Sequence, residues 1–421
     1  MEAFQHKKKH LHCEDVDLAA IAADVGTPAY VYSRTAFVTR LRELDEAFGG
    51  IEHLICYSAK ANGSLAVLQA LIEAGAGVDI VSGGELYAAQ RAGADPRKIV
   101  FAGVGKTTDE IERALRAGIL FFTVESEPEL DRIATVADRL GVVGRFAVRV
   151  NPDVETDTHD YITTGTSRNK FGIAIDRARD VYVRAQDMPS VQAVGVHMHI
   201  GSQIMTPDPY VEAIRKIILL VEELRKAGIT LTYFDIGGGY GIRYDGERPQ
   251  AAPQFADAIV PLVEPLGLTL VLEPGRYIAG NSGVLLARVE YVKRTPSKTF
   301  VIVDAAMNDL IRPALYKAVH RIVPVENSTA KTETVDVVGP VCESGDFFAK
   351  GVVLPALKEG DLVAIMSAGA YGATMGSTYN ARPLPPEVLV SGRSYSVVRA
   401  RQTYEQMYAN NVLPSPRRVG K

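Results

Sequence analysis

The amino-acid sequence predicts an α/β protein that combines a TIM-type (β/α)8 barrel with a second, mostly antiparallel β domain. Eight short apolar runs alternate with amphipathic helical segments up to about Gly280, and the alternation stops there. The chain has 421 residues, whereas a single α/β barrel accounts for about 250 residues. We therefore expect a barrel over residues 36–280, and a β domain built from residues 1–35 and 281–421.

The apolar runs have the length and composition of buried parallel strands. They are His53–Ser58, Gly77–Val81, Lys98–Ala102, Leu120–Val124, Arg145–Val150, Val194–His199, Tyr233–Ile236 and Thr269–Leu272. Between them, segments such as Val211–Lys226 repeat apolar residues at helical spacing. A similar repeat over residues 37–48 predicts a helix before the first strand, with Ser33 or Thr35 as its cap. An open doubly wound sheet is the alternative, but unbroken alternation favours a closed barrel.

After the barrel, strand-like runs follow one another without regular helices, as is typical of an antiparallel sheet. These runs are Val284–Thr295, Lys298–Asp304, Glu333–Val338, Leu362–Ser367 and Glu387–Val390. Pro28–Tyr32 is also extended in character, and we expect it to add a strand to this domain. The polar segment Asn151–Gly172 fits neither pattern, and its length suggests a lid or a binding loop.

The composition is that of an ordinary globular protein, with 47% hydrophobic and 23% charged residues. A net charge of −4 gives no reason to expect nucleic acid or an anionic membrane as a partner. The three cysteines show no C-x-x-C spacing, which argues against a disulfide framework and a cysteine zinc site. We find no signal-peptide pattern and no apolar run of about 20 residues, so we expect a cytoplasmic protein.

Chemically active residues gather where the predicted strands end. In a barrel of this kind, the catalytic groups stand at the C-terminal ends of the strands. The residues found there are Lys60, Asp79, His197, His199, Ser202, Gly237, Gly238, Gly239, Glu273, Pro274, Gly275 and Arg276. Each has an ordinary explanation when taken alone: a surface lysine, a tight glycine turn or a surface ion pair. Their occurrence together at one end of a barrel points to a site.

His197 and His199 allow a different interpretation, because alternate side chains of a strand share one face. A His-x-His pair could be half of a metal site, and a metal-dependent hydrolase is therefore an alternative class. Such a site needs further ligands at other strand ends. The remaining histidines mostly fall at the N-terminus, at a strand start or in the second domain. We therefore expect no metal.

The group of residues matches the requirements of pyridoxal phosphate (PLP). This cofactor needs a lysine that bonds to its aldehyde, a cradle for its phosphate, and an acid that keeps its pyridine nitrogen protonated. A glycine loop at the start of a helix is suited to binding phosphate. The residues that would meet these needs, in order, are Lys60, the Gly237–Gly239 loop with Ser202 and Arg276, and Glu273. We expect His199 to stack on the cofactor ring.

With these motifs, the sequence resembles the alanine-racemase-like (fold type III) PLP enzymes and, among them, the diaminopimelate decarboxylases. The resemblance runs from about Leu11 to Val390. Its motifs are Tyr57–Asn62, His199–Gln203, Gly237–Gly241, Glu273–Arg276, Met307–Tyr316, Gly339–Ser344 and Gly369–Gly372. It implies PLP-dependent decarboxylation of meso-2,6-diaminopimelate to L-lysine and CO2, the last step of lysine biosynthesis.

The resemblance also implies roles for individual residues. Lys60 and Cys342 would be catalytic, with Cys342 protonating the carbanion that remains after loss of CO2. The implied cofactor-binding residues are Lys60, Asp79, His199, Ser202, Gly238, Gly239, Glu273, Pro274, Gly275, Arg276 and Tyr371. The implied substrate-binding residues are Arg276, Arg312, Tyr316, Glu343 and Tyr371. The family further implies a homodimer whose active sites lie between the barrel of one subunit and the β domain of the other.

The chemistry of diaminopimelate agrees with these roles, because its far end carries both an ammonium and a carboxylate. Arg276 and Arg312 can hold that carboxylate, while Glu343 can bind the ammonium. An ornithine decarboxylase would need acids at this place and no arginine clamp. A racemase would place an arginine, not Glu273, against the pyridine nitrogen. The alternatives that stay open are a decarboxylase for another amino acid, whether free or carrier-bound, and a non-catalytic PLP-binding regulatory homologue.

Overall fold

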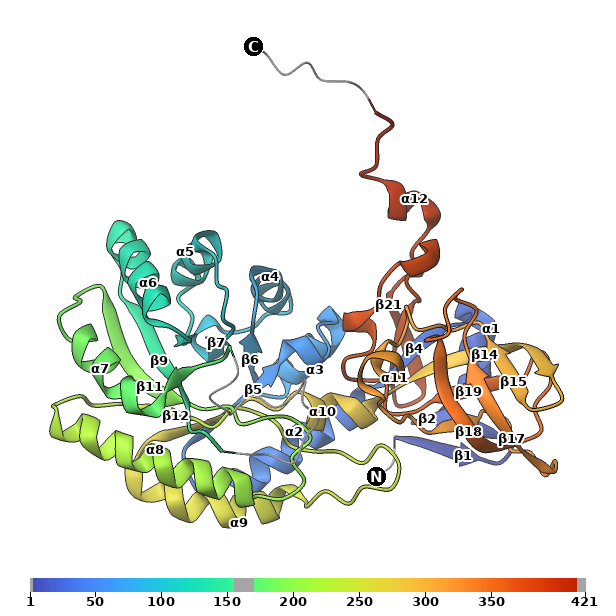
Figure 1. Ribbon diagram of the computed structural model, residues 1–421, viewed down its shortest axis with the longest axis horizontal. Helices are drawn as coiled ribbons and strands as arrows, with labels where there is room; N and C mark the ends of the chain where they lie inside the picture. Colours follow the sequence, from blue (N-terminus) through green and yellow to red (C-terminus); the bar gives the residue numbers. More distant parts are fainter. Residues whose placement is uncertain (1–2, 155–169, 415–421) are drawn as a thin grey trace.

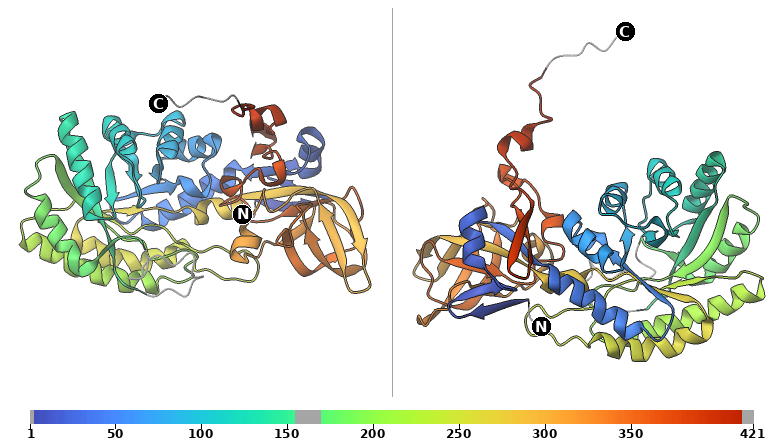
Figure 2. Two further views of the ribbon diagram at one scale, coloured as in Figure 1. Left: turned by 45° about the horizontal axis from the view of Figure 1, so that its top comes forward. Right: turned by 180° about the vertical axis from the view of Figure 1, so that it is seen from behind.

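The computed structural model describes residues 3–154 and 170–414, and the statements below concern these residues. They form a closed parallel barrel and, beside it, a β domain (Figure 1). The barrel helices lie outside the barrel strands in each of the three ribbon views (Figure 2). The predicted fold class is confirmed.

Eight parallel strands close the barrel, because β9 pairs with both β8 and β11. Around the ring, the strands are β5 (His53–Ser58), β6 (Gly77–Ile80), β7 (Ile99–Phe101), β8 (Phe121–Val124), β9 (Gly144–Asn151), β11 (Val191–His197), β12 (Tyr233–Asp235) and β13 (Thr269–Leu272). The short strand β10 (Ile173–Ala174) pairs with β9. Most bounds lie within one or two residues of the predicted ones. Strand β11 ends at His197, so His199 stands beyond the strand and not on it.

The helices of the barrel bury one face against the strands. They are α2 (Arg34–Phe48), α3 (Leu65–Glu73), α4 (Gly83–Arg91), α5 (Thr108–Ala117), α6 (Glu127–Leu140), α7 (Ile175–Ala185), α8 (Asp208–Lys226), α9 (Ala252–Val263) and α10 (Arg276–Ala279). Of the two caps predicted for α2, Ser33 is the one used, since its side chain accepts a hydrogen bond from the Ala36 N–H. The predicted helix over Val211–Lys226 is α8, which begins one turn earlier.

A core of apolar side chains fills the inside of the barrel below the C-terminal ends of the strands. Because side chains alternate along each strand, every second residue points into the barrel. One apolar cluster of the structure draws its buried members mainly from different barrel strands: Cys56, Val100, Leu120, Phe121, Ala147, Val194 and Val271. The interior of the barrel is therefore a packed core and not a pore, and the polar groups at the C-terminal strand ends lie directly above it.

The β domain is a mixed sheet in which antiparallel pairs predominate. Its strands follow the order β18-β17-β15-β14-β4-β20-β21, and β19 pairs with β14 and β16. Their bounds are β4 (Ala29–Ser33), β14 (Gly283–Arg294), β15 (Thr299–Val303), β16 (Ile322–Pro324), β17 (Thr332–Val338), β18 (Phe347–Pro355), β19 (Leu362–Ile365), β20 (Glu387–Ser391) and β21 (Ser394–Arg399). Only β15–β17 and β4–β20 pair in parallel. The predicted N-terminal strand is β4, which lies between β14 and β20.

Several smaller elements complete the described chain. A three-stranded sheet of β1 (Phe4–Lys7), β2 (His10–Cys13) and β3 (Val16–Asp17) precedes α1 (Leu18–Val25). Helices α11 (Arg312–Tyr316) and α12 (Tyr404–Tyr408) follow later. In Figure 1, the blue N-terminal elements lie against the orange strands of the β domain. Most of the expected lid, Asn151–Gly172, lies outside the described residues.

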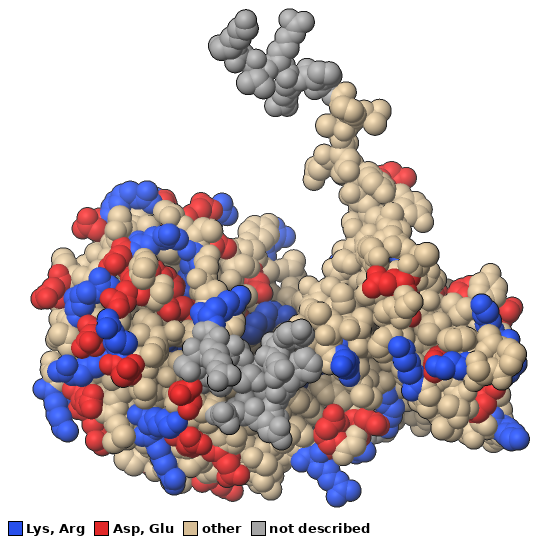
Figure 3. Space-filling view, viewed as in Figure 1, with Lys and Arg blue, Asp and Glu red and all other residues tan. Residues whose placement is uncertain are grey.

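Charged side chains of both signs are interspersed over the face seen in Figure 3. This face therefore shows no large basic area of the kind that binds nucleic acid. Among the described residues, no helix combines the length and apolar character that a membrane crossing requires.

Candidate active site

Lys60 lies just beyond β5, in a 3-10 turn formed by Ala59–Ala61. Its Nζ donates a hydrogen bond to Asp79 Oδ2 at 3.0 Å, and Ser58 Oγ donates to the same oxygen at 2.6 Å. The side chain of Asp79 is fully buried, whereas 39% of the Lys60 side chain is exposed. Burial alone would lower the pKa of Lys60, but the charges of Asp79, Tyr371 and Glu273 and the hydrogen bond to Asp79 together outweigh it and raise the pKa above its usual value. Lys60 is thus held by a buried carboxylate and remains accessible.

A buried carboxylate, Glu273, stands directly after β13, and its Oε2 lies 3.3 Å from His197 Nε2. Burial opposes ionisation of Glu273, but the nearby His197 and Lys60 lower its pKa to about 2. Its Oε1 has no hydrogen-bond partner among the described residues. An ionised carboxylate with a spare oxygen is the group needed to hold a protonated pyridine nitrogen.

Asp235 completes this buried group, and its Oδ1 accepts a hydrogen bond from the Gly237 N–H at 2.8 Å. Burial and the charge of Glu273 raise the pKa of Asp235 well above its usual value. Potential ligand atoms of His197, Asp235 and Glu273 all lie within 4.8 Å of one another, so the residue types would suit a metal ion. His199, the other half of the predicted pair, is not part of this group. The absence of a metal stays a prediction.

His199 contacts the glycine loop that follows β12. The Gly238 N–H donates to His199 Nδ1 at 3.3 Å, so Nδ1 is the acceptor and a neutral ring carries its proton on Nε2. Burial, together with the charges of Arg149 and Lys60, lowers the pKa of His199 well below its usual value. A neutral imidazole held in this way can lie flat against an aromatic ring without adding a positive charge.

The glycine loop has no room for side chains. A Cβ on Gly237 would lie 2.6 Å from His199 Nδ1, and one on Gly238 would lie 2.1 Å from the carbonyl oxygen of Glu273. A Cβ on Gly239 would lie 2.4 Å from the Gly201 carbonyl oxygen, and Gly239 also has a φ of +110°. The loop is therefore packed tightly on the neighbouring strand ends, as the binding of a phosphate by backbone groups requires.

We predict that Gly238→Ala destabilises the protein by about 1–3 kcal/mol, because its Cβ would overlap the Glu273 backbone. Retention of PLP should fall as well, since the loop must move. Gly246→Ala is the matched control, because no atom lies within 4 Å of its added Cβ. Thermal melts of the two cofactor-free variants, followed by PLP titration, measure both effects. Equal melting temperatures for the two variants would contradict the prediction.

The turn before α10 packs on the turn that carries Lys60. The Ser58 N–H donates to the Pro274 carbonyl oxygen at 3.2 Å, and a Cβ on Gly275 would lie 3.0 Å from that of Ala61. The N–H of Tyr371, from the β domain, donates to the Ala61 carbonyl oxygen at 2.8 Å. Two predicted cofactor segments and a residue of the second domain therefore meet at Lys60.

Arg276 begins α10 and is buried. Its Nε and Nη2 donate to Ser202 Oγ at 3.3 and 2.9 Å, and its Nη1 donates to the hydroxyl of Tyr244. The guanidinium carbon lies 5.0 Å from the centre of the Tyr371 ring. The predicted partners Ser202, Arg276 and Tyr371 are thus in contact, and Tyr244 is an additional member of the site that the sequence analysis did not identify.

Arg312 begins α11 and is also buried. Its guanidinium carbon lies 4.8 Å from the centre of the Tyr244 ring, and its Nη1 lies 2.8 Å from His320 Nε2. No sequence pattern marked His320 or Tyr244, because neither stands at a strand end or in a motif used for the prediction. The described residues provide no carboxylate ion-pair partner for Arg312 or Arg276.

Cys342 and Glu343 lie in the segment between β17 and β18, and both are exposed. The Cys342 N–H donates to Asn380 Oδ1 at 3.3 Å, and Glu343 Oε2 accepts a hydrogen bond from the Tyr379 hydroxyl at 2.9 Å. These two hydrogen bonds stay within the β domain. Tyr316, at the end of α11, is half-buried and close enough to Arg276 to influence its pKa.

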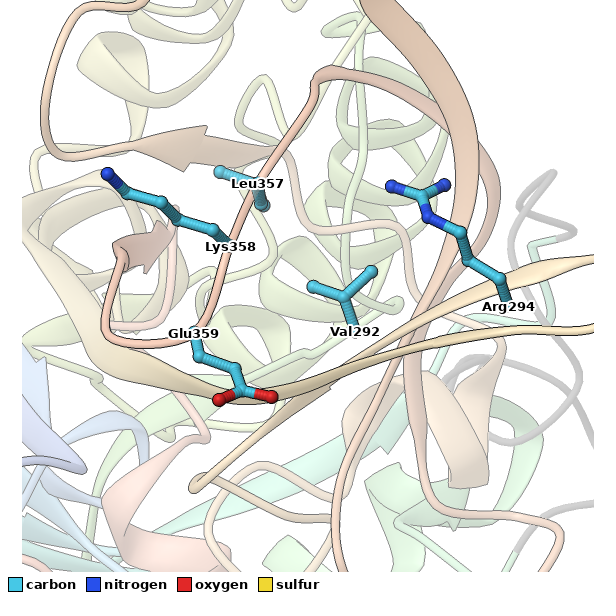
Figure 4. A pocket seen from close by; sticks show the side chains of 5 residues that line it. All are labelled: Val292, Arg294, Leu357, Lys358 and Glu359. Atoms are coloured by element: carbon cyan, nitrogen blue, oxygen red, sulfur yellow. The ribbon is translucent and has the colours of Figure 1, made fainter.

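Two hollows lie apart from Lys60. One of about 370 Å³ lies on the β domain and is lined by Val292, Arg294, Leu357, Lys358 and Glu359 (Figure 4). Its arginine already pairs with Glu333 at 2.5 Å, so it offers little for a ligand. The other, about 1140 Å³, runs between α2, the segment after the glycine loop and the N-terminal strands, and includes Tyr244 in its wall. Neither is lined by Lys60 or Glu273.

Known proteins show similar sequences. A family model described as the pyridoxal binding domain of the pyridoxal-dependent decarboxylases matches residues 34–280. A diaminopimelate decarboxylase of Pseudomonas aeruginosa is 49% identical over 98% of this chain and 99% of its own length. Another, of Aquifex aeolicus, is 46% identical over 95% of each chain.

Solved structures agree with the sequence relatives. The diaminopimelate decarboxylase of Helicobacter pylori, in complex with L-lysine, has a TM-score of 0.91 at 41% identity, covering 94% of this chain and 99% of that one. That of M. jannaschii, also with L-lysine, has a TM-score of 0.94 at 36% identity, covering 98% of both chains. Together with the geometry around Lys60, these relationships show that the chain belongs to the diaminopimelate decarboxylase family of PLP-dependent decarboxylases.

Proposed function

We propose that the C-terminal end of the barrel removes one carboxylate of meso-2,6-diaminopimelate as CO2 and leaves L-lysine, with the residues described above in defined roles. The family supplies the reaction and the cofactor. The observation that carries the substrate assignment is the pair of buried guanidiniums, Arg276 and Arg312, without a carboxylate partner in the described chain. Buried charges of this kind require an anionic ligand.

The residues at the strand ends fit PLP, which supplies an electron sink for the bond that breaks when CO2 leaves. Lys60 would bond to its aldehyde, and Glu273 would accept a hydrogen bond from its pyridine nitrogen. The low pKa of Glu273, about 2, keeps that carboxylate ionised over the physiological range. His199 would pack against the ring, and the glycine loop would bind the phosphate together with Ser202 and Arg276. Asp79 keeps Lys60 in position.

The substrate carries a second amino-acid group at its far end, and the remaining predicted residues suit it. Arg312 would bind the far carboxylate by a charge-assisted hydrogen bond, while Glu343 would bind the far ammonium. Tyr316 and Tyr371 would close the sides of this part of the site. Because Glu343 and Cys342 are exposed in the single chain, we propose that they complete the site of a second subunit in a homodimer.

Loss of CO2 breaks the bond between the α-carbon and its carboxylate carbon, and the electron pair stays with the α-carbon. A proton must then reach that carbon. We assign the donor role to the thiol of Cys342 of the partner subunit, which would form the new C–H bond. The barrel, residues 36–280, would therefore act with residues 1–35 and 281–421 as two domains of one shared site.

The direct test is an assay of the purified protein with PLP and meso-diaminopimelate, in which CO2 and L-lysine are measured together. We expect both products in equal amounts. Ornithine, arginine and L-lysine serve as comparison substrates. Turnover of one of these, without turnover of meso-diaminopimelate, would overturn the substrate assignment while leaving the PLP-dependent chemistry in place.

Arg312→Ala should lower kcat/KM for meso-diaminopimelate by about 100-fold or more, because a carboxylate in the site would lose a buried charged partner. The loss should be much smaller for L-lysine or ornithine, which have no far carboxylate. PLP binding should change little, since Arg312 contacts Tyr244 and His320 and not the glycine loop. Steady-state kinetics with the three substrates measure the difference. Equal losses for all three would make Arg312 a structural residue.

A further inference from the structure

Arg312 is held by a histidine where a buried arginine usually pairs with a carboxylate. An arginine side chain can only donate hydrogen bonds, because it has N–H groups and no acceptor atom. His320 Nε2, 2.8 Å from Arg312 Nη1, must therefore accept, and His320 Nδ1 donates to the Met366 carbonyl oxygen at 2.8 Å. Both ring nitrogens are used, and the ring is neutral.

Burial and the charges that face His320 keep it neutral. The residue is 2% exposed. The pKa of His320 is lowered to about 3. Burial is the largest cause, and the positive charges of Arg312 in α11 and Arg276 in α10 add to it. The Met366 carbonyl oxygen opposes this effect, and the Tyr244 ring packs edge-on at 5.3 Å.

Tyr244 connects the two arginines. Its hydroxyl accepts a hydrogen bond from Arg276 Nη1, while its ring centre lies 5.8 Å from the Arg276 guanidinium carbon and 4.8 Å from that of Arg312. The electron-rich face of an aromatic ring attracts cations. Tyr244 thus allows two like charges to stay buried near each other without an acid between them.

We propose that His320 and Tyr244 are positioning residues that hold Arg312 with its charge uncompensated, beside Arg276, and that this charge of Arg312 selects substrates with a far carboxylate. A carboxylate in place of His320 would hold Arg312 just as well but would cancel its charge. A neutral acceptor fixes the direction of the guanidinium and leaves its charge for the substrate. The inference rests on the proposed role of Arg312.

Three substitutions of His320 separate geometry from charge. In His320→Gln, the amide oxygen can reach the place of Nε2 and accept from Arg312, and the side chain stays neutral. His320→Glu offers a charged acceptor at the same place. His320→Asn is too short to reach Arg312 but can still donate to the Met366 carbonyl oxygen. Thermal melts of the holoenzymes show which variants are folded.

For meso-diaminopimelate, we expect His320→Gln to keep kcat/KM within about tenfold of the parent, and His320→Glu to lose about 100-fold. His320→Asn should lose about tenfold or more, because Arg312 is no longer held. All three should affect decarboxylation of L-lysine much less. If His320→Glu and His320→Gln behave alike with meso-diaminopimelate, charge at this place does not select the substrate and the inference fails.

A binding measurement that needs no turnover supports the kinetic test. Borohydride reduction should fix PLP in the site and give an inactive protein, which is titrated by calorimetry with pimelate, the seven-carbon diacid without amino groups. The parent and His320→Gln should bind pimelate, and His320→Glu and Arg312→Ala should not. Full binding by Arg312→Ala would overturn the role of Arg312 itself. Loss in Arg312→Ala, with full binding by His320→Glu and by His320→Asn, would overturn only the role of His320.

Discussion

Lys60→Ala is expected to lower kcat for meso-diaminopimelate by about 1,000-fold or more, because the variant lacks the amine that bonds to the cofactor and exchanges with the substrate. The structure places this amine 3.0 Å from a fully buried carboxylate, Asp79, at the mouth of the barrel. No other described lysine has this combination of a strand-end position and partial exposure beside Glu273 and His199. CO2 release from PLP-saturated protein measures the loss.

The covalent attachment gives a second measurement. Borohydride treatment of the parent holoenzyme should add a phosphopyridoxyl group to the peptide that contains Lys60, as mass spectrometry of a digest would show. Lys226→Ala is the matched control, because Lys226 is an exposed residue in the last turn of α8, and this variant should keep full activity and labelling. Label on a different lysine, or undiminished turnover by Lys60→Ala, would show that the site has been placed wrongly.

The barrel, and the meeting of its strand-end residues at one place, could be predicted because both depend on local sequence. Strands β5 and β13 have the predicted bounds, since both are short apolar runs that end at a polar or glycine-containing turn. The lysine, the glycine loop and the acid follow strand ends, and barrel topology alone brings such positions together. Strand β18 was not predicted, because Phe348 and Leu354 are its only buried residues and the rest of the strand is at least partly exposed.

The contacts that His320 and Tyr244 make with the two arginines could not be predicted from local sequence patterns. His320 follows α11 after a turn with Lys317 in the left-handed region, and it meets Arg312 only because the chain reverses there. Tyr244 comes from a loop between two barrel elements and contacts residues 32 and 68 positions later. The contact with Arg312 depends on the packing of the β domain against the barrel, and the contact with Arg276 depends on the packing of a loop within the barrel. The roles of Cys342 and Glu343 likewise came from the family resemblance and not from spacing.

Mixing two inactive variants should restore activity if the sites are shared between subunits. Lys60→Ala removes the barrel amine, and Cys342→Ala removes the proposed proton donor in the β domain. Each homodimer then has two defective sites. A mixed dimer has one site in which both residues are missing and one in which both are present. With random exchange of equal amounts, half of the dimers are mixed, so about a quarter of the parent activity should return.

The structure provides the reason to expect this recovery. Cys342 is exposed and its backbone N–H bonds to Asn380, whereas the Lys60 amine is held by Asp79 on the barrel. The experiment mixes differently tagged variants and exchanges subunits under mild denaturant. The quarter applies to this mixture, and the isolated doubly tagged dimer, with one intact site of two, should release CO2 at about half of the parent rate. Cys13→Ala mixed with Lys60→Ala is the control, because Cys13 is buried away from the barrel mouth and its variant should be active alone. Doubly tagged dimers of Lys60→Ala and Cys342→Ala that stay inactive would mean that each site takes both residues from one chain, and Cys342 would then act in the site of its own subunit.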